Sequence, residues 1–295
     1  MTLTAQEFAY VRDLVHREAA IVLGPGKEYL VEARLTPLAR RFGLTTVSEY
    51  VAQAARRPEH TQHIVEALTT NETSWFRDRE PFTILADRVL PELIATRPPG
   101  QPLRLWSAAC SSGQEPYTIA MVLRDAIPAG RRYEILCSDI SREMVQRTET
   151  GRYSQLEVNR GLPATMLVRH FERVGVDWQV SPALRLDMSY RRINIATPLP
   201  ELPLFDVIFL RNVLIYFDLP TKRAVLRRVR ELLRPGGYLF LGTAETTIGI
   251  DAEYERVEAG STSVYRPAPL APAPNTAASS MRVDVIAPAR VRGEG

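Results

Sequence analysis

Residues 103–120 are LRLWSAACSSGQEPYTIA, an apolar run followed by small residues and then by a pattern that opens a helix. The run at 103–108 predicts a buried strand, and residues 110–113 are small enough for a tight turn. Pro116 suits the first turn of a helix, where its missing N–H would be unpaired anyway, and Glu115 lies where the helix dipole favours negative charge. Together these features predict a cofactor pocket at the end of a parallel sheet.

The turn in this stretch argues against two kinds of nucleotide site. It does not match G-x-G-x-x-G, and no Gly-Lys-Ser/Thr follows it, so neither a dinucleotide nor a nucleoside triphosphate held by its phosphates is expected. A carboxylate at the mouth of the pocket favours a ligand with a cationic or hydroxyl-bearing end. An ordinary strand–helix junction of an α/β protein remains the alternative at this point.

A second strand is predicted at 133–140, YEILCSDI, with Asp139 near its carboxyl end. The spacing of Asp139 after Gly113 resembles that of the acidic residue that binds ribose hydroxyls in cofactor-binding α/β domains. We therefore infer a ligand with an adenosine moiety held by its ribose. Asp139 would also suit the cap of a helix over 141–147, and the two roles are compatible.

The alternation of strands and helices continues to the end of the folded chain. Residues 205–210, FDVIFL, are typical of a strand buried on both faces. Residues 176–180 and 184–190 alternate apolar and polar side chains as paired antiparallel strands do, which predicts a small inserted β subdomain. The other predicted strands of this region lie at 192–195, 238–241, 254–257 and 262–265, the last two as a closing hairpin.

The first part of the chain, from residue 4 to about residue 70, has helical periodicity and no predicted strand. Helix breaks are predicted around Gly24–Gly26 and at Gly43, with Ser48 as the cap of a third helix and Pro58 before a fourth. This segment is basic, and we expect it either to be a solvated helical face or to dock an acidic, helical partner. The basic residues are Lys27, Arg34, Arg40, Arg41, Arg56 and Arg57.

A polar, aromatic and basic segment, TTNETSWFRD at 69–78, separates this part from the α/β part. It has neither helical nor strand period, and loops of this composition beside a rigid domain often carry function. A helix is predicted from Glu80 to Arg97, with Phe82, Leu85 and Leu90 among its inward residues, and Pro98-Pro99-Gly100 ends it.

The composition sets the broad class. The chain has 295 residues, 45% of them hydrophobic and 24% charged, with a formal net charge of +3. These values are typical of a globular protein, and the small net charge does not by itself indicate a nucleic-acid partner. The sequence has no apolar run as long as a membrane span and no signal peptide at its start, so we expect a cytoplasmic protein without membrane insertion. Cys110 and Cys137 are expected as buried thiols, and the scattered histidines predict no metal site.

Three elements converge on one family: SGQEPY at 112–117, SDI at 138–140, and PGG at 235–237 before a strand. They resemble the Rossmann-like S-adenosylmethionine-dependent methyltransferase fold. Two further segments, TNETSWFR at 70–77 and LRNVLIYF at 210–217, narrow the resemblance to the chemotaxis receptor methyltransferase family, CheR. The resemblance runs from about Thr4 to Tyr265, leaving out only the C-terminal tail.

The resemblance implies a cofactor, S-adenosyl-L-methionine, with S-adenosyl-L-homocysteine as its product, and a set of site residues. It implies Arg77 and Tyr216 as catalytic, orienting groups, with Arg77 also on the cofactor or the acidic substrate. The implied cofactor-binding residues are Asn71, Thr73, Arg77, Glu115, Asp139, Asn194, Ile195, Arg211 and Asn212. The implied product is a methyl ester on receptor glutamates, for sensory adaptation. A glutamate carboxylate is already ionised at neutral pH, so no general base is required.

The resemblance also implies a domain plan for this α/β chain. We expect a helical, receptor-docking domain at 1–79, a linker helix at 80–101, and a methyltransferase domain at 102–266 with its β insertion at about 152–191. The Pro- and Ala-rich residues 267–295 are expected to be a disordered tail, because they have few large apolar side chains to bury.

The implied partner is the cytoplasmic helical domain of a chemoreceptor, met by a monomeric enzyme, with no nucleic acid involved. Residues 171–178 lack the glycine-containing insertion of family members that grip a receptor's C-terminal pentapeptide, so we expect no such tether. Trp75 stands where the family more often has Phe, and Gln114 where Glu is frequent. A nucleic-acid or small-molecule methyltransferase and a non-catalytic scaffold remain as alternatives.

Overall fold

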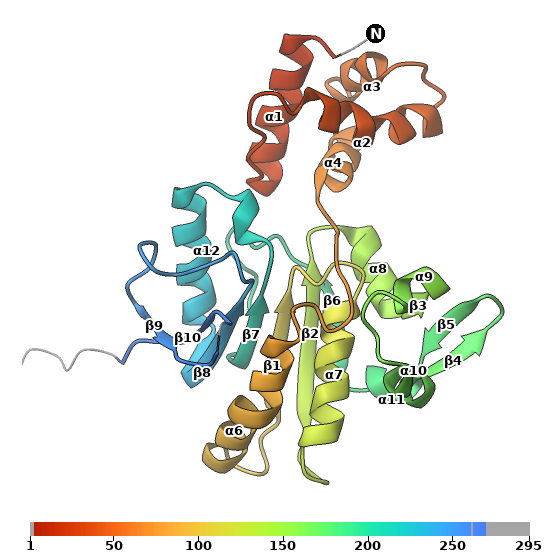
Figure 1. Ribbon diagram of the computed structural model, residues 1–295. Helices are drawn as coiled ribbons and strands as arrows, with labels where there is room; N and C mark the ends of the chain where they lie inside the picture. Colours follow the sequence, from red (N-terminus) through yellow and green to blue (C-terminus); the bar gives the residue numbers. More distant parts are fainter. Residues whose placement is uncertain (1–2, 261, 270–295) are drawn as a thin grey trace, which may run out of the picture.

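The computed structural model describes residues 3–260 and 262–269. Figure 1 shows two bodies joined by one extended segment: a cluster of helices from the start of the chain, and a sheet with helices on both sides. The predicted disordered tail lies outside the described residues, except for its first three positions. The division into domains at the predicted boundaries stays a prediction.

The helical body has a core of its own, in which Val11, Leu35, Tyr50 and Ile64 are fully buried. Two of its helices begin with a capping box, in which the side chain of an N-cap threonine and that of a glutamate three residues later each accept a backbone N–H. The third helix is capped by Thr46 and not, as predicted, by Ser48. Its helices are α1 (Ala5–Ala19), α2 (Glu28–Arg41), α3 (Val47–Ala54) and α4 (Pro58–Leu68).

The predicted helix at 80–97 is present but is not uniform. It begins as α5 (Glu80–Ile84), passes through a π-helical turn, η1 (Leu85–Val89), and ends as α6 (Leu90–Thr96). Pro91 follows the π-helical turn. A proline inside a helix removes one backbone hydrogen bond, and a wider turn is one way in which a helix accommodates such a disturbance.

A seven-stranded sheet forms the second body, in the order β6-β2-β1-β7-β8-β10-β9. The first five strands in this order are parallel to one another. Strand β10 is antiparallel to both of its neighbours, β8 and β9, and its pairing with β9 confirms the predicted closing hairpin. The strands are β1 (Leu103–Ala108), β2 (Tyr133–Asp139), β6 (Met188–Arg192), β7 (Phe205–Leu210), β8 (Leu233–Leu241), β9 (Tyr254–Val257) and β10 (Val264–Pro267).

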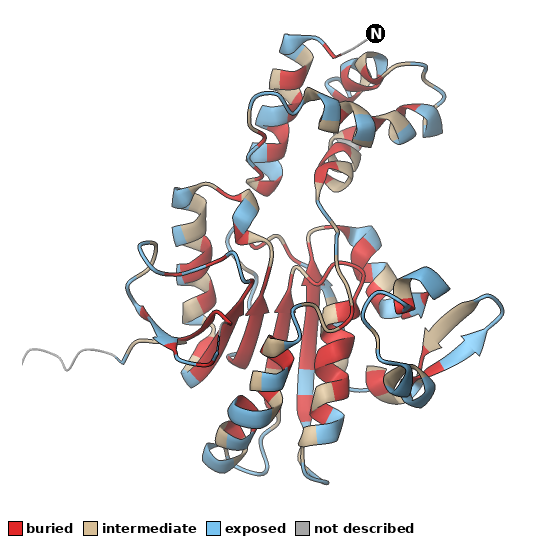
Figure 2. Cartoon of the chain, viewed as in Figure 1, coloured by how far each residue is buried: buried red, intermediate tan, exposed pale blue. Residues whose placement is uncertain are grey.

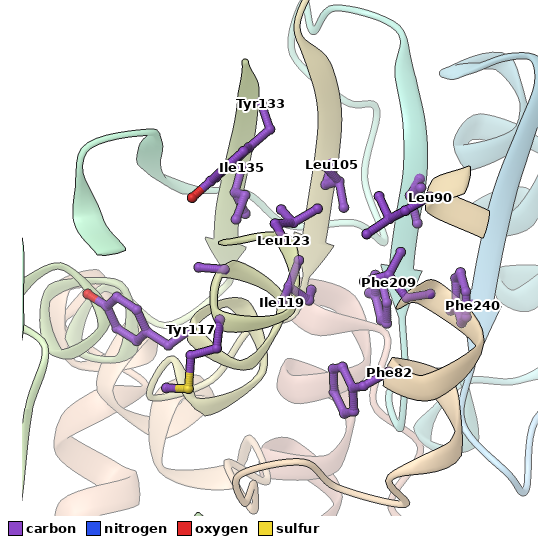
Figure 3. Close-up of a cluster of buried hydrophobic side chains, with 14 of the residues drawn as sticks. Phe82, Leu90, Leu105, Tyr117, Ile119, Leu123, Tyr133, Ile135, Phe209 and Phe240 are labelled. Atoms are coloured by element: carbon purple, nitrogen blue, oxygen red, sulfur yellow. The ribbon is translucent and has the colours of Figure 1, made fainter. Parts of the chain in front are cut away.

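Helices cover both faces of this sheet, so its central strands are buried (Figure 2). On one face, α7 (Gln114–Ala126) and the η1–α6 helix pack against Leu105, Phe209 and Phe240. Figure 3 shows this packing, with Ile119 and Leu123 of α7 over the strands and Phe82 beside Phe209. On the other face, α12 (Leu219–Glu231) packs against Trp106, Ile208 and Leu239. This is the two-sided burial predicted for 205–210.

A second, three-stranded sheet projects from the main one between α8 (Arg142–Thr150) and β6. Its order is β3-β5-β4, all antiparallel, so the predicted β excursion exists. The predicted pairing within it is wrong: of residues 184–190, expected to pair with 176–180, residues 188–190 belong to β6, which pairs in parallel with β2. The small subdomain comprises β3 (Arg152–Tyr153), α9 (Gln155–Val158), α10 (Ala164–His170), β4 (Phe171–Val174), β5 (Asp177–Val180) and α11 (Pro182–Arg185).

Across residues 3–260 and 262–269, the structure holds no helix that combines the length and the apolar character needed to span a membrane.

Candidate functional site

A cavity lies at the carboxyl edge of the sheet, where β2, β1 and β7 end side by side. The chain runs outward from β1 through β2 to β6 on one side, and through β7 to β8 on the other, so the cavity lies at the point where the strand order reverses. This is where open α/β sheets bind their ligands. The segment after α4 and the end of α1 supply the opposite wall, through residues 69–73, Ala19 and Ile21.

Asp139 is the buried acid of this edge, with 5% of its surface exposed. Its Oδ2 accepts the backbone N–H of Ser111 at 2.9 Å, and its Oδ1 accepts that of Ser141 at 2.9 Å. Burial raises the pKa of this carboxyl, and the backbone donors partly oppose the effect. Each carboxylate oxygen can accept a second hydrogen bond, so Asp139 can still receive donors from a ligand in the cavity.

The turn after β1 is shaped for close approach of a ligand. Ala109 and Ser111 have φ values of 61° and 50°, which non-glycine residues rarely adopt, and such strain collects at functional sites. Gly113 begins α7 with a φ of 97°, and a Cβ there would lie 2.8 Å from Thr148 Cγ2 and from the Tyr153 hydroxyl. Glycine is therefore required at the helix N-terminus that faces the cavity.

A buried ion-pair network lies on the β7 side of the turn. Arg211, whose side chain is 1% exposed, donates to Glu115 Oε2 at 2.9 Å and to Asp78 Oδ2 at 2.6 Å. Its guanidinium also donates to the carbonyl of Arg77 at 3.0 Å, while the Ser107 hydroxyl donates to Glu115 Oε1 at 2.8 Å. Arg211 thus ties the segment before α5 to the first turn of α7, and it fixes the Glu115 carboxylate within the cavity wall.

The segment at 71–78 is fixed from two sides, although it has no regular structure. The Trp75 indole donates to the carbonyl of Glu157 at 3.0 Å, and the backbone N–H of Trp75 donates to that of Arg160 at 3.1 Å. On the other side, the Ser111 hydroxyl donates to the carbonyl of Asn71 at 2.8 Å. The small subdomain and the β1 turn therefore hold this segment over the sheet edge, where Asn71, Thr73 and Arg77 line the cavity.

The segments after β6 and β7 close the cavity against the helical body. The side-chain amide of Asn194 donates to the carbonyl of Glu18 at 2.8 Å, and the backbone N–H of Val22 donates to the carbonyl of Tyr216 at 2.9 Å. Among the described residues, the Tyr216 hydroxyl has no hydrogen-bond partner, so it is available to a ligand.

The cavity changes in character from one side to the other. Near Asp139 the lining is apolar, because it contains Ile140 and Ile193. Ile140 follows Asp139 in the chain, and the backbone N–H of Ile193 donates to the Asp139 carbonyl at 3.0 Å. Near β1 and β7 it is charged, with Glu115, Arg211 and Arg77. Within the described residues, the buried Nε of Arg211 has no partner. An apolar region beside a buried acid, followed by a charged region, fits an adenosine linked to an amino-acid end.

Neither a nucleophilic thiol nor a metal site is found among the described residues. Cys110 and Cys137 are free and buried, and burial raises the pKa of both thiols, so neither has the character of a nucleophile. The described part of the chain contains no cluster of three or more His, Cys, Asp or Glu residues arranged to hold a metal ion.

The structure brings every residue expected at the site into the lining of this one cavity: Asn71, Thr73, Arg77, Glu115, Asp139, Asn194, Ile195, Arg211, Asn212 and Tyr216. Their individual roles stay predictions. Sequence reasoning missed Ser107 and Ser111, which hold Glu115 and Asn71, and it missed Ala19 at the end of α1 and Ile21 just after that helix. It also missed Glu245, whose carboxylate accepts three backbone N–H groups of the loop after β7. No motif around Glu245 gave a signal.

Comparison with family models gives two matches that together cover most of the chain. Residues 71–263 match the model described as "CheR methyltransferase, SAM binding domain", where SAM is S-adenosyl-L-methionine. Residues 6–69 match the model described as "CheR methyltransferase, all-alpha domain". The boundary between the two matches falls in the segment that joins α4 to the sheet body.

Curated relatives align over nearly their whole length. The chain is 39% identical to the chemotaxis protein methyltransferase 1 of Pseudomonas aeruginosa over 275 residues, which cover 90% of this chain and 99% of that protein. It is 38% identical to the chemotaxis protein methyltransferase Cher2 of Pseudomonas putida, over 88% of this chain and 97% of that protein. The chemotaxis protein methyltransferase of Escherichia coli is 34% identical, over 83% of this chain and 86% of that protein.

Proposed function

The chain belongs to the CheR methyltransferase family and uses S-adenosyl-L-methionine as its cofactor, and from that premise we propose its acceptor. We propose that it transfers the cofactor's methyl group to glutamate side chains of chemoreceptor cytoplasmic helices. The products are glutamyl methyl esters and S-adenosyl-L-homocysteine.

The observation that carries this proposal is the kind of polar group that the cavity offers. Its carboxylates are already engaged: Asp139 by backbone N–H groups, Glu115 by Arg211 and Ser107, and Glu72 by an exposed ion pair with Arg160 at 3.3 Å. No histidine is among the residues that line the cavity in the described chain. A carboxylate acceptor is ionised at neutral pH and needs no base, whereas an amine or hydroxyl acceptor must lose a proton during transfer.

The chemistry then needs alignment more than proton transfer. The bound cofactor supplies an electrophilic methyl group on a sulfonium centre. Transfer to a glutamate carboxylate oxygen would break the methyl carbon–sulfur bond and leave its electron pair on sulfur. No proton moves, and a charged pair becomes a neutral ester and a neutral thioether. The enzyme's contribution is to hold the two reactants in line and to exclude water.

The family resemblance suggests roles for the lining residues, and their places in the cavity support them. We assign Asp139 to the ribose hydroxyls, with Ile195 and Asn194 beside the adenine. Glu115, fixed by Arg211, faces the amino-acid end of the cofactor. Arg77 and Tyr216 line the cavity, and we assign the Arg77 guanidinium and the Tyr216 hydroxyl to orienting the acceptor carboxylate.

The surface proposed to dock the receptor lies on the helical body. Arg40, Arg41, Arg56 and Arg57 are exposed, and no ion pair within the described chain engages any of them. Arg34 has a different role, because its guanidinium donates to the carbonyls of Ala67 and Thr69 at the end of α4. The four exposed arginines complement an acidic helical partner, which we propose the enzyme meets as a monomer in the cytoplasm.

The proposed acceptor is tested by incubating the full-length enzyme with methyl-labelled S-adenosyl-L-methionine and purified receptor cytoplasmic domains of the same organism. The expected label is base-labile and is released as methanol, because it is a methyl ester. It is lost from receptor variants in which the labelled glutamates are replaced by alanine. Base-stable label on the receptor, or label on nucleic acid alone, would overturn the proposal.

A further inference from the structure

Glu245 carries a buried carboxylate that receives four backbone N–H groups. It lies just after β8, and 5% of its surface is exposed. Its Oε2 accepts from Asn212 and from Gly242, both at 2.7 Å. Its Oε1 accepts from Val213 at 2.9 Å and from Leu214 at 2.7 Å. Within the described residues, no cation pairs with this carboxylate, so backbone dipoles alone balance its charge.

The donors show what this carboxylate holds. Three of the four donors, Asn212, Val213 and Leu214, are consecutive residues that follow β7. Leu214 is also the first residue of the short 3-10 helix η2 (Leu214–Tyr216). Consecutive N–H groups converge on one acceptor only where the chain turns sharply, and Asn212 has a φ of 58°. A Cβ at Gly242 would lie 2.7 Å from Asn212 Nδ2 and 2.8 Å from Glu245 Oε2, so glycine is required there as well.

The loop held in this way carries much of the cavity wall. Arg211, Asn212, Val213, Tyr216 and Phe217 all line the cavity, whereas Glu245 and Gly242 do not. Glu245 therefore acts on a ligand only through the backbone of this loop. The loop spans both functional ends of the cavity, from Arg211, which fixes Glu115, to Tyr216, which is assigned to the acceptor.

We propose that Glu245 is the positioning residue that sets the 211–217 loop for cofactor binding and methyl transfer, and that its negative charge is essential to this role. The part that concerns methyl transfer rests on the proposed function, and the part that concerns cofactor affinity does not. A glutamine cannot replace the carboxylate, because its amide NH2 would face two N–H donors in either orientation. An aspartate keeps the charge but is one methylene shorter.

The test compares Glu245→Gln and Glu245→Asp with a core variant of similar stability loss. Leu226→Ala is the matched control, because Leu226 is fully buried in α12 against the opposite face of the sheet from α7 and does not line the cavity. Three quantities are measured: amide hydrogen exchange in the cofactor-free protein, the affinity for S-adenosyl-L-homocysteine by calorimetry, and the separate values of kcat and KM on the receptor domain.

For Glu245→Gln we expect the amides of residues 212–214 and 242 to exchange at least about tenfold faster. We expect the dissociation constant for S-adenosyl-L-homocysteine to rise about tenfold or more. A small misplacement of groups that align the reactants slows the reaction strongly, so kcat should fall about a hundredfold. We expect the rise in KM to be smaller than this fall in kcat. Glu245→Asp should recover part of each loss, and it replaces the glutamine variant if that variant does not fold.

Two results would overturn the proposal. One is wild-type exchange at these amides and wild-type cofactor affinity in Glu245→Gln. The other is an equal loss of affinity in Leu226→Ala, which would mean that the effect is general destabilisation. If the wild-type enzyme does not methylate the receptor, the proposed acceptor fails, but exchange and cofactor affinity still decide the role of Glu245.

Discussion

The Asp139 carboxyl group makes cofactor affinity a function of pH. Ribose hydroxyls donate to its carboxylate, so binding favours the ionised form, and affinity is lost as the pH falls through the pKa of the cofactor-free protein. Because burial raises that pKa, the loss should begin at a higher pH than for an exposed aspartate. Calorimetric titration with S-adenosyl-L-homocysteine from about pH 7.5 to about pH 5 measures the effect.

Asp139→Asn is the control for this titration, because an amide does not ionise in this range. Its affinity at neutral pH should be lower by about 1.5–3 kcal/mol, the value of hydrogen bonds to a charged acceptor. Its affinity should also vary less with pH than that of the wild type. Equal pH dependence in both proteins would assign the titration to another group.

Tyr216 contributes one hydroxyl without a partner among the described residues, and its removal should affect turnover more than binding. For Tyr216→Phe we expect kcat to fall by about tenfold or more, with little change in the affinity for S-adenosyl-L-homocysteine. Tyr133→Phe is the matched control, since its hydroxyl is buried without a partner in the described chain and lies at the amino end of β2, away from the cavity. An unchanged kcat in Tyr216→Phe would remove this residue from the transfer step.

At the scale of residues, the sequence located the side chains of the site but not the groups that hold them. Asp139 and Glu115 follow from local rules, because a strand end and a helix start each favour a particular residue type. Glu245 follows from no local rule: it lies more than thirty residues from three of the four amides that it binds. Arg34 illustrates the same limit, since a basic residue within a basic segment turned out to bond to the end of α4.

Among the elements, the end of α2 and the turn between α3 and α4 present the exposed arginines proposed to meet the receptor. Reversing the charge of Arg40, Arg41, Arg56 and Arg57 together should weaken receptor methylation and reduce its salt dependence, while cofactor affinity stays unchanged. Arg223→Glu with Arg227→Glu is the control, because both residues are exposed on α12, outside the helical body. Wild-type methylation by the first variant would place the docking surface elsewhere.

The three-stranded sheet β3-β5-β4 bears on whether the enzyme binds a peptide from the C-terminus of a receptor. Its β4–β5 hairpin turns tightly at Gly175, and β4 is a four-residue edge strand. Without a longer loop there, we expect no saturable micromolar binding of peptides copied from the receptors' C-termini. Calorimetry with the isolated enzyme measures this. Saturable binding that perturbs Trp178, on the central strand of this sheet, would contradict the expectation, since short edges can still add a strand.

The same region shows why strand pairing was harder to predict than strand existence. Apolar and polar side chains alternate in residues 177–180 and at the start of residues 188–192. Such alternation indicates that one face of a strand is buried, but it does not indicate which strand pairs with it. In the structure the first joins the small sheet, while the second lies beside β2 as an edge strand of the main one. Partner choice is decided by contacts distant in sequence, which a local pattern does not contain.

The whole molecule consists of two bodies joined across the cavity by polar contacts and by apolar ones, since Ile140 and Tyr216 pack against the helical core. The backbone bond from Val22 to Tyr216 and the side-chain bond from Asn194 to Glu18 cross between them. A ligand in the cavity touches both bodies, so we expect S-adenosyl-L-homocysteine to slow hydrogen exchange at Val22, which lies outside the sheet body. Exchange at Val22 that does not depend on the ligand would show that the two bodies do not close on it.

Because both bodies wall one cavity, we expect a ligand bound there to stabilise the folded protein as a whole. A ligand that binds the folded protein and not the unfolded chain adds to its stability by mass action, in proportion to the logarithm of ligand concentration once the site is saturated. The enzyme's heat resistance and its lifetime against proteases should then rise and fall with the cell's supply of methyl donor. A culture starved of methionine would hold less of this protein, in addition to working it more slowly.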